Sequence, residues 1–500
     1  MADTPRAHLN ATLVRGVAWV GAFRWSAQIL GWASTLLVVR LLTPRDYGIA
    51  GIAMMYVGLA GLVSEFGMGA AIVALPERER GELARLHGFA IAVAATLAAL
   101  TVGLALPLSR FFREPALARV LALLGLALLS EGMRVVPTAI LSKDLQYRAT
   151  GFIDFLKASV TSALVLLLAA LKFGYWALIL GNLGGSLVAT VFTLLRYPLP
   201  VRWPRLDGLQ EVVRYSWHIL VGRASWYAYR NADFAVAGRM LGSGILGHYT
   251  IAWNIASLPG EKLTTVITAA TTPFFARIQG DRDSLRFYFL RITEVLSLVI
   301  VPLLAGLILV ADLAVPVVLG PAWIPAVPAL RLLVGYAVLQ SVSTPISQVL
   351  TVCGRARLLM WNGLLCLAVL PPAFVLGASL AGGTGIAAAW LITYPILALP
   401  AILGIFRTLD LRLFEYAAAW GSALRGAAAM TAAVVGLRYL LPHGFPPAIE
   451  LAAAVLTGGA AYAGTVHLLD RGRVRRAIEM IRAARATGAP VAEPAAGAPV

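Results

Sequence analysis

The chain has 500 residues, of which 59% are hydrophobic and only 13% are charged, and its formal net charge is +17. A soluble domain carries about 25% charged residues, so this composition excludes a soluble globular protein. The basic excess fits loops that face anionic lipid, so we expect membrane lipid and no nucleic acid as a partner. The two cysteines, Cys353 and Cys366, are too few for a disulfide framework or a metal site.

Apolar stretches of about 20 residues, the length of a membrane-spanning helix, recur along the chain. The first, at 17–39, is too long for the core of a cleavable signal, and we interpret it as the first spanning helix. We therefore expect an all-α polytopic membrane protein with about fourteen transmembrane helices. Their expected ranges are 17–39, 47–75, 84–109, 116–141, 151–171, 175–196, 215–239, 246–275, 289–311, 324–351, 358–380, 384–406, 415–441 and 446–469.

Basic residues are divided unevenly between the loops on the two sides of the membrane. About 25 Lys and Arg lie on the side of the termini and about 8 on the other, so the positive-inside rule places both termini in the cytoplasm. The expected cytoplasmic N-terminus is 1–16. The tail at 471–500 sets arginines against apolar residues at helical spacing, which predicts a basic amphipathic helix at the membrane surface with a disordered end.

An internal repeat relates the two halves of the chain. When the seventh helix is aligned with the first, Arg24 falls on Arg223 and Arg40 on Arg239, and with a three-residue insertion Tyr47 falls on Tyr249. Because an even number of helices separates the copies, the repeats are parallel and their pseudo-two-fold axis runs along the membrane normal. The expected domains are two six-helix bundles at 17–200 and 215–408, a cytoplasmic linker at 201–214, and two extra helices at 409–470.

Several charged residues lie inside the expected helices. Each costs about 2.5–3.5 kcal/mol near the bilayer centre, so these residues must pair, face a wet interior or lie near an interface. Glu131 and Arg134 are three residues apart on one helix face, as are Asp154 and Lys157, and we expect both as structural ion pairs. The others are Arg24, Arg223, Arg230, Lys262, Arg331, Arg425, Glu65, Asp233 and Glu261.

Arg24 and Arg223 are the strongest candidates for binding because they occupy equivalent places in the two repeats. Neither has an acid three or four residues away. The planar guanidinium group bonds two phosphate oxygens at once, so we expect both arginines to hold a diphosphate in a central cavity. Arg230 and Lys262 are candidates to complete this site.

Glu65 and Asp233 have two interpretations. They are candidates for binding a coupling ion, or they pair with an intramembrane arginine, which would then serve structure rather than substrate. The sequence has no Walker loop, no spacing typical of metal ligands and no locally supported Ser/His/Asp arrangement. We therefore expect a transporter and not an enzyme, with no catalytic residues, metal or cofactor.

Short motifs in order along helices one to eleven carry a resemblance to a known family. They include Arg40-Leu41-Leu42-Thr43-Pro44-Arg45-Asp46-Tyr47-Gly48, Glu65-Phe66-Gly67-Met68-Gly69, Gly174-Tyr175-Trp176, Gly238-Arg239-Met240-Leu241-Gly242, Pro273-Phe274-Phe275 and Leu319-Gly320-Pro321-Ala322-Trp323. The chain resembles the polysaccharide transporter (oligosaccharide flippase) family of the multidrug/oligosaccharidyl-lipid/polysaccharide exporter superfamily, in particular its colanic-acid and teichuronic-acid exporter type. His248 departs from the small or aliphatic residue usual before Tyr249.

The resemblance implies a flippase of the bacterial inner membrane. Its expected activity is to move undecaprenyl-diphosphate-linked oligosaccharide to the outer leaflet by alternating access, for exopolysaccharide or O-antigen-type biosynthesis. A polysaccharide polymerase and glycosyltransferases of the same pathway are the implied partners. Three alternatives stay open: a peptidoglycan-precursor flippase, a drug or cation exporter of the same superfamily, and a membrane glycosyltransferase or polymerase. The last usually needs a large outward loop, and no expected outward loop is long.

Overall fold

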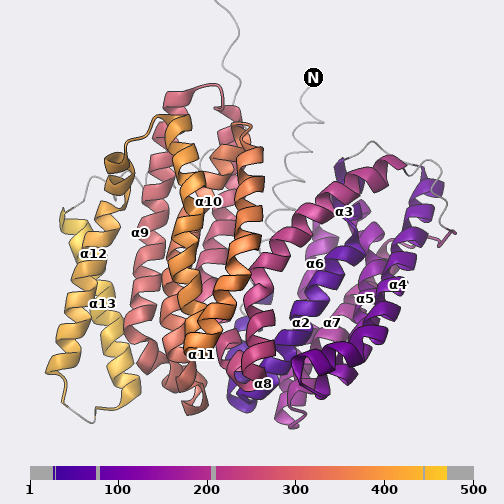
Figure 1. Cartoon of the computed structure of the whole chain (residues 1–500), viewed down its shortest axis with the longest axis horizontal. Coiled ribbons are helices and arrows are strands. Elements are labelled where there is room, and N and C mark those ends of the chain that lie inside the picture. The colour runs from indigo at the N-terminus through magenta and orange to yellow at the C-terminus, as the bar shows by residue number, and fades with distance from the viewer. Residues whose placement is uncertain (1–25, 29, 75–78, 204–209, 443–444, 470–500) are drawn as a thin grey trace, which may run out of the picture. The chain divides into compact units, whose positions relative to one another are not determined.

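The computed structural model describes residues 26–28, 30–74, 79–203, 210–442 and 445–469. All regular structure in these ranges is helical (Figure 1). The elements are a first helix at Ser26–Leu41, α2 (Pro44–Glu65), α3 (Met68–Ala74), α4 (Arg80–Phe112), α5 (Ala116–Lys143), α6 (Tyr147–Ala170), α7 (Tyr175–Arg196), α8 (Gln210–Arg277), α9 (Arg282–Ala314), the π turn η1 (Val315–Leu319), the 3-10 turn η2 (Pro321–Ala326), α10 (Val327–Val352), α11 (Ala356–Leu409), α12 (Leu413–Leu440) and α13 (Pro447–Leu469).

Nine helices within the described ranges are long and apolar enough to cross a membrane. The expectation of an all-α polytopic membrane protein is therefore confirmed. α8 and α12 fall outside this set of nine, and both carry several charged side chains. The expected total of about fourteen spans and the pseudo-two-fold axis stay predictions.

Two long helices bend where the sequence analysis expects a connection between two spans. α8 bends at Gly242, whose φ is 80°, and α11 bends at Ala381 and Gly382, where φ of the glycine is 59°. Glycine adopts these left-handed angles without a Cβ clash, so the chain can change direction in one residue. Each connection is thus a tight turn of one or two non-helical residues between two helices.

α2 begins at a capped turn and ends at a sharp break. The Thr43 side chain accepts a hydrogen bond from the Asp46 N–H, and the Asp46 carboxylate accepts one from the Thr43 N–H at 2.9 Å. This reciprocal cap pairs N–H groups that the first helical turn leaves open. The break comes at Phe66 and Gly67, both with positive φ. The helix expected at 47–75 is therefore interrupted, and α3 continues it.

Helices α2 to α7 pack closely around α5 and α7. α4 lies along α5, α6 lies along α7, and α5 also contacts α2, α3 and α7. Small residues permit this approach: a Cβ on Gly132 would meet Ala94, and a Cβ on Gly185 would meet Thr161. The close packing fixes the faces of α5, α6 and α7 relative to one another.

By its contacts the chain divides into two compact units. Among the described residues, the first contains those within 26–254, 318–329 and 363–393, and the second contains those within 255–317, 330–362 and 394–469. Residues 215–254, which follow the expected linker, therefore belong to the same unit as the expected first bundle. The expected bundle boundaries stay a prediction about the repeat.

In the second unit, α12 and α13 contact α9 through ion pairs as well as through apolar packing. α12 packs along both α13 and α9. The Asp312 carboxylate accepts from Arg331 at 2.7 Å and from Arg438 at 2.6 Å. Arg438 also pairs with Glu450 of α13 at 3.1 Å. One arginine therefore connects α9, α12 and α13, and Arg331 has a partner in the protein.

In the first unit, the first turns of α2 and the segment of α8 that follows Gly242 contact each other reciprocally. A Cβ on Gly48 would overlap the Ser243 backbone, and a Cβ on Gly247 would overlap the Pro44 backbone. The alignment of helix seven on helix one, continued without an insertion, places Pro44 on Ser243 and Gly48 on Gly247. Each contact is then the repeat equivalent of the other, as in a two-fold interface. The inserted alignment, which pairs Gly48 with Thr250, lacks this property.

Two arginines that the repeat also equates extend this contact. Arg40 Nε donates to the Val318 carbonyl at 2.8 Å. The Arg239 guanidinium lies over the Phe111 ring, 5.1 Å from its centroid. Arg40 thus reaches η1, which follows α9, and Arg239 reaches the last turn of α4. We call these four contacts the reciprocal contact.

Candidate functional site

The structure pairs two of the residues that the sequence proposes for different roles. Arg223 Nη1 lies 3.3 Å from both carboxylate oxygens of Glu65, and the two side chains are 48% and 34% exposed. This pairing is the structural alternative considered for Arg223. Arg24 lies outside the described residues, and so does the side chain of Lys262. Arg230 lies over the ring of Trp226, 5.0 Å from its centroid.

Asp233 is fully buried and accepts three hydrogen bonds. Its donors are the Tyr249 hydroxyl at 2.6 Å, the Trp390 Nε1 at 2.9 Å and the Phe234 N–H at 2.9 Å. A buried carboxylate is costly unless it is hydrogen-bonded in this way. Asp233 and Tyr249 lie on opposite sides of the bend at Gly242, and Trp390 lies in α11. The carboxylate therefore fixes the bend of α8 and attaches it to α11.

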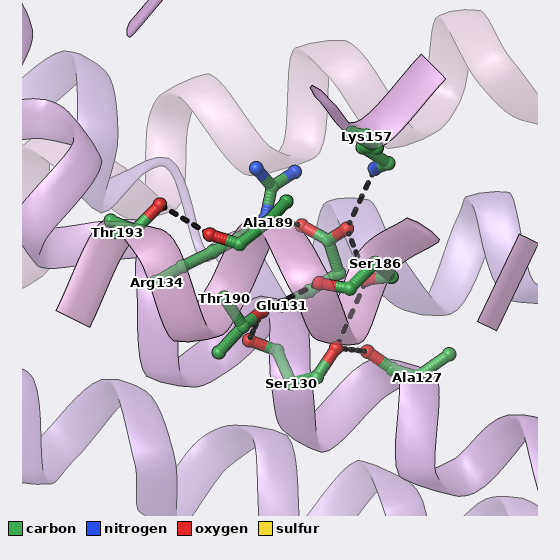
Figure 2. Close-up of polar contacts among 9 residues, drawn as sticks. All are labelled: Ala127, Ser130, Glu131, Arg134, Lys157, Ser186, Ala189, Thr190 and Thr193. Atoms are coloured by element: carbon green, nitrogen blue, oxygen red, sulfur yellow. Dashed lines mark hydrogen bonds and ion pairs between the residues drawn. The ribbon is translucent and has the colours of Figure 1, made fainter. Parts of the chain in front are cut away.

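A third group of charged residues forms the best-defined polar centre in the first unit. Figure 2 shows Glu131 and Arg134 of α5, Lys157 of α6 and Ser186 of α7 converging from three helices. The Glu131 carboxylate accepts from Arg134 Nε at 2.6 Å, from Lys157 Nζ at 3.2 Å and from Ser186 Oγ at 3.1 Å. We call these four residues the Glu131 cluster.

Buried hydroxyl groups hold Ser186 in place behind the cluster. Ser186 Oγ lies 3.0 Å from Ser130 Oγ, and Thr190 Oγ1 donates to the Ser130 carbonyl at 3.1 Å and to the Ser186 carbonyl at 2.9 Å (Figure 2). All three side chains are buried. The network joins α5 to α7 and orients the donor that Glu131 receives from α7.

The Glu131 cluster carries one more positive charge than negative. Arg134 and Lys157 share one carboxylate, and no other acid within the described ranges pairs with either. Arg134 uses only Nε for Glu131. Figure 2 shows its two terminal nitrogens directed away from that carboxylate, and no other described residue bonds them. Such a planar pair of N–H donors is suited to two oxygens of a phosphate group.

The cluster opens onto a cavity of about 560 Å³. Residues of α2, α3, α5, α6 and α7 line it, and they include Glu65, Arg134, Lys157 and Asn182. Aliphatic side chains such as Leu62 form most of the remaining wall. The cavity therefore combines apolar walls with a few convergent polar groups, the usual composition of a ligand site.

The sequence identifies these charges but assigns them to structure alone. The expected Glu131–Arg134 ion pair is confirmed. The expected Asp154–Lys157 pair is wrong, because Lys157 reaches across to Glu131 of the neighbouring helix instead. Helical spacing does not single out Ser186 or Asn182. No sequence signal places Lys157 beside Glu131, because the two residues are 26 positions apart on different helices.

The family follows from a comparison with known proteins. A sequence profile of the family described as polysaccharide biosynthesis protein matches residues 37–328. The chain belongs to this family. The resemblance seen in the sequence motifs is thereby confirmed.

Curated members and relatives of this family share moderate identity with the chain over long stretches. The lipopolysaccharide biosynthesis protein WzxC of Escherichia coli is 26% identical over 75% of this chain and 78% of its own length. The succinoglycan biosynthesis transport protein ExoT of Rhizobium meliloti is 24% identical over 96% and 97%. The teichuronic acid biosynthesis protein TuaB of Bacillus subtilis is 24% identical over 70% and 73%.

Solved structures of two other proteins share the fold of this chain. The lipid II flippase MurJ, in an inward closed conformation, matches with a TM-score of 0.74 at 13% identity, over 91% of this chain and 99% of that chain. An inward-facing multidrug resistance transporter of the MATE family matches with a TM-score of 0.61 at 16% identity, over 78% and 95%. At these identities the likeness concerns the fold alone.

Proposed function

We propose that the protein flips a lipid-linked oligosaccharide from the inner to the outer leaflet of a bacterial inner membrane. The lipid carrier is joined to the glycan through a diphosphate, and the glycan serves exopolysaccharide or O-antigen-type biosynthesis. Both termini face the cytoplasm in this proposal. Glycosyltransferases supply the substrate and a polymerase consumes it. The names of the relatives support the process, and the Glu131 cluster supports the chemistry.

The observation that carries the proposal is the excess positive charge of the Glu131 cluster, where no described residue bonds the two terminal nitrogens of Arg134. Charged groups in spanning helices are expensive, so an excess cation there needs water or an anion beside it. Arg134 presents two N–H donors where a diphosphate oxygen pair can bind, and Lys157 adds a point charge beside it. The aliphatic wall of the cavity would adjoin the lipid end of the substrate.

The expected Arg24 and Arg223 clamp is retained as a second part of the proposal. Glu65 lines the same cavity as the Glu131 cluster. Arg223 pairs with Glu65 and is therefore next to this cavity. A phosphate that enters the cavity can replace Glu65 as the partner of Arg223. Glu65 would then be free to take up a proton or a cation. Arg230, Lys262 and Asp233 stay candidates for binding and coupling.

Alternating access requires that one end of the path be closed while the other is open. In the proposed orientation the reciprocal contact lies at the outer ends of helices one, two, seven and eight. We infer that it closes the outer side in this conformation. Movement of an anion outward is favoured by the membrane potential, by about 2.3 kcal/mol per charge per 100 mV.

The experiment that tests the function is complementation of a gene deletion. Deletion should cause a diphosphate-linked glycan to accumulate on the cytoplasmic leaflet, and the wild-type gene should clear it. Arg134→Ala should reduce clearance about tenfold to a hundredfold, because charge-assisted hydrogen bonds contribute about 1.5–3 kcal/mol. Arg196→Ala, at the exposed end of α7, is the control and should clear normally. Normal clearance by Arg134→Ala at equal expression would refute the proposed site.

A further inference from the structure

A second cavity adjoins the first and has different walls. Its volume is about 420 Å³, and it lies between the first helix, α6 and α7, with one residue each from α2 and α8. Lys157 and Asn182 line both cavities. A ligand group in the second cavity is therefore a direct neighbour of a group held by the Glu131 cluster.

The second cavity is lined by hydroxyl, amide and carboxylate groups. Thr35 and Asp154 are exposed in it, together with Asn182 and Asn254. Ser34, Thr161 and Ser162 add further hydroxyls, and Ser34 Oγ donates to the Ser162 carbonyl at 3.2 Å. Polar groups thus form a larger share of this lining than of the lining of the first cavity.

Several of these groups are oriented so that they present acceptors. Thr35 Oγ1 donates its proton to the Gly31 carbonyl at 2.8 Å, which leaves its lone pairs for a ligand. Asn182 Nδ2 donates to the Leu178 carbonyl at 2.8 Å, and no described residue bonds its Oδ1. Asp154 has no partner in the described part of the chain. The wall therefore offers oxygen atoms to a ligand rich in O–H donors.

The lining of the second cavity carries no net charge. Its described charged residues are Asp154 and Lys157, which have opposite signs, and Lys157 is held by Glu131. A neutral cavity of this size, within the range of about 300–1,000 Å³ typical of small-molecule sites, suits an uncharged polar ligand. A saccharide is such a ligand, because its hydroxyls donate to and accept from side chains of this kind.

We propose that the second cavity is a saccharide subsite that binds the sugar next to the diphosphate. This proposal rests on the proposed function, since it assumes that the diphosphate occupies the Glu131 cluster. Lys157 and Asn182 then lie at the junction of sugar and phosphate. Asp154 and Thr35 contact the sugar alone and determine which sugar is accepted.

The test measures binding of two probes to the full chain in nanodiscs. One probe is a short-chain polyprenyl diphosphate that carries a single hexose, either glucose or galactose, and the other is the same lipid diphosphate without sugar. The wild type should bind one of the hexose probes about tenfold more tightly than the sugar-free lipid, as expected for two or three hydrogen bonds. Asp154→Asn and Thr35→Val should each remove most of this difference and leave binding of the sugar-free lipid in place.

Two controls separate the possible outcomes. Thr96 is exposed on α4, and its hydroxyl donates to the carbonyl four residues earlier, as the hydroxyl of Thr35 does. Thr96→Val should therefore retain the preference for sugar. Arg134→Ala should weaken the binding of both probes equally. If it weakens the binding of neither, the diphosphate does not bind at the Glu131 cluster, whereas a sugar preference that depends on Asp154 and Thr35 still supports the subsite. The subsite is overturned if the wild type does not distinguish the probes, if Asp154→Asn and Thr35→Val retain the preference, or if they weaken both probes alike.

Discussion

Glu131 connects three helices through one carboxylate, and this explains why two cations can lie in its neighbourhood. Arg134 comes from its own helix, whereas Lys157 and Ser186 come from α6 and α7. One acid offsets one of the two positive charges. The remaining charge is stable only where water or an anion reaches it, and the cavity provides that access.

Asp233 differs from the Glu131 cluster in that it leaves no excess charge, because three fixed protein donors surround its carboxylate. Asp233→Asn should lower thermal stability, because an amide cannot accept from all three donors and leaves at least one buried group unsatisfied, at a cost of about 1–3 kcal/mol. The measurement is thermal unfolding in detergent. Asp144→Asn, at the exposed end of α5, should leave the midpoint unchanged. Equal midpoints for Asp233→Asn and the wild type would show that the three hydrogen bonds do not hold the bend of α8.

At the scale of elements, the sequence predicts the helices and the turns at Gly242 and Gly382, and it misses the break after Glu65. The length of the apolar stretches and the Pro and Gly residues between them locate the spans, because each spanning segment must satisfy its own backbone hydrogen bonds. The turn at Gly242 falls in the connection expected between 215–239 and 246–275, whereas the break after Glu65 falls inside the helix expected at 47–75. That break depends on two residues with positive φ, which apolar periodicity does not encode.

The same limit applies to the charges of the candidate site. The Glu131–Arg134 pair is local, at three residues, and follows from helix geometry. The partner of Lys157 is on another helix, and Glu65 is far from Arg223 in the chain. Helical spacing therefore predicts the first pair and cannot choose a partner in the other two cases.

The two additional helices provide a prediction at this scale. Arg438→Ala should loosen α12 and α13 from α9, because Asp312 and Glu450 both lose their shared partner. Hydrogen exchange of α13 should become faster. Tyr439→Ala, at a side chain that is 89% exposed, is the matched control. Unchanged exchange in Arg438→Ala would mean that apolar packing alone attaches these helices.

At the scale of the whole molecule, the reciprocal contact predicts which state the transporter prefers. Gly48→Ala should destabilise the closed outer side, because the added Cβ overlaps the Ser243 backbone and the helices must separate. Gly247→Ala should have the same effect for the equivalent reason. A cysteine at Thr35, in a variant without the native cysteines, should then react faster with an impermeant maleimide added outside intact cells.

Gly244→Ala is the control for this experiment, since nothing lies within 4 Å of a Cβ at that position. It should label at the rate of the parent protein. If Gly48→Ala and Gly247→Ala also label at that rate, the reciprocal contact is not the outer closure.

The central claim is that the cavity beside the Glu131 cluster carries a lipid diphosphate across the membrane. The most direct measurement is movement of a diphosphate-linked glycan between leaflets of liposomes that contain only the purified protein. The wild type and Arg196→Ala should move it at equal rates, and Arg134→Ala at least about tenfold more slowly. Equal rates for Arg134→Ala and the wild type, or no movement by the wild type, would contradict the account.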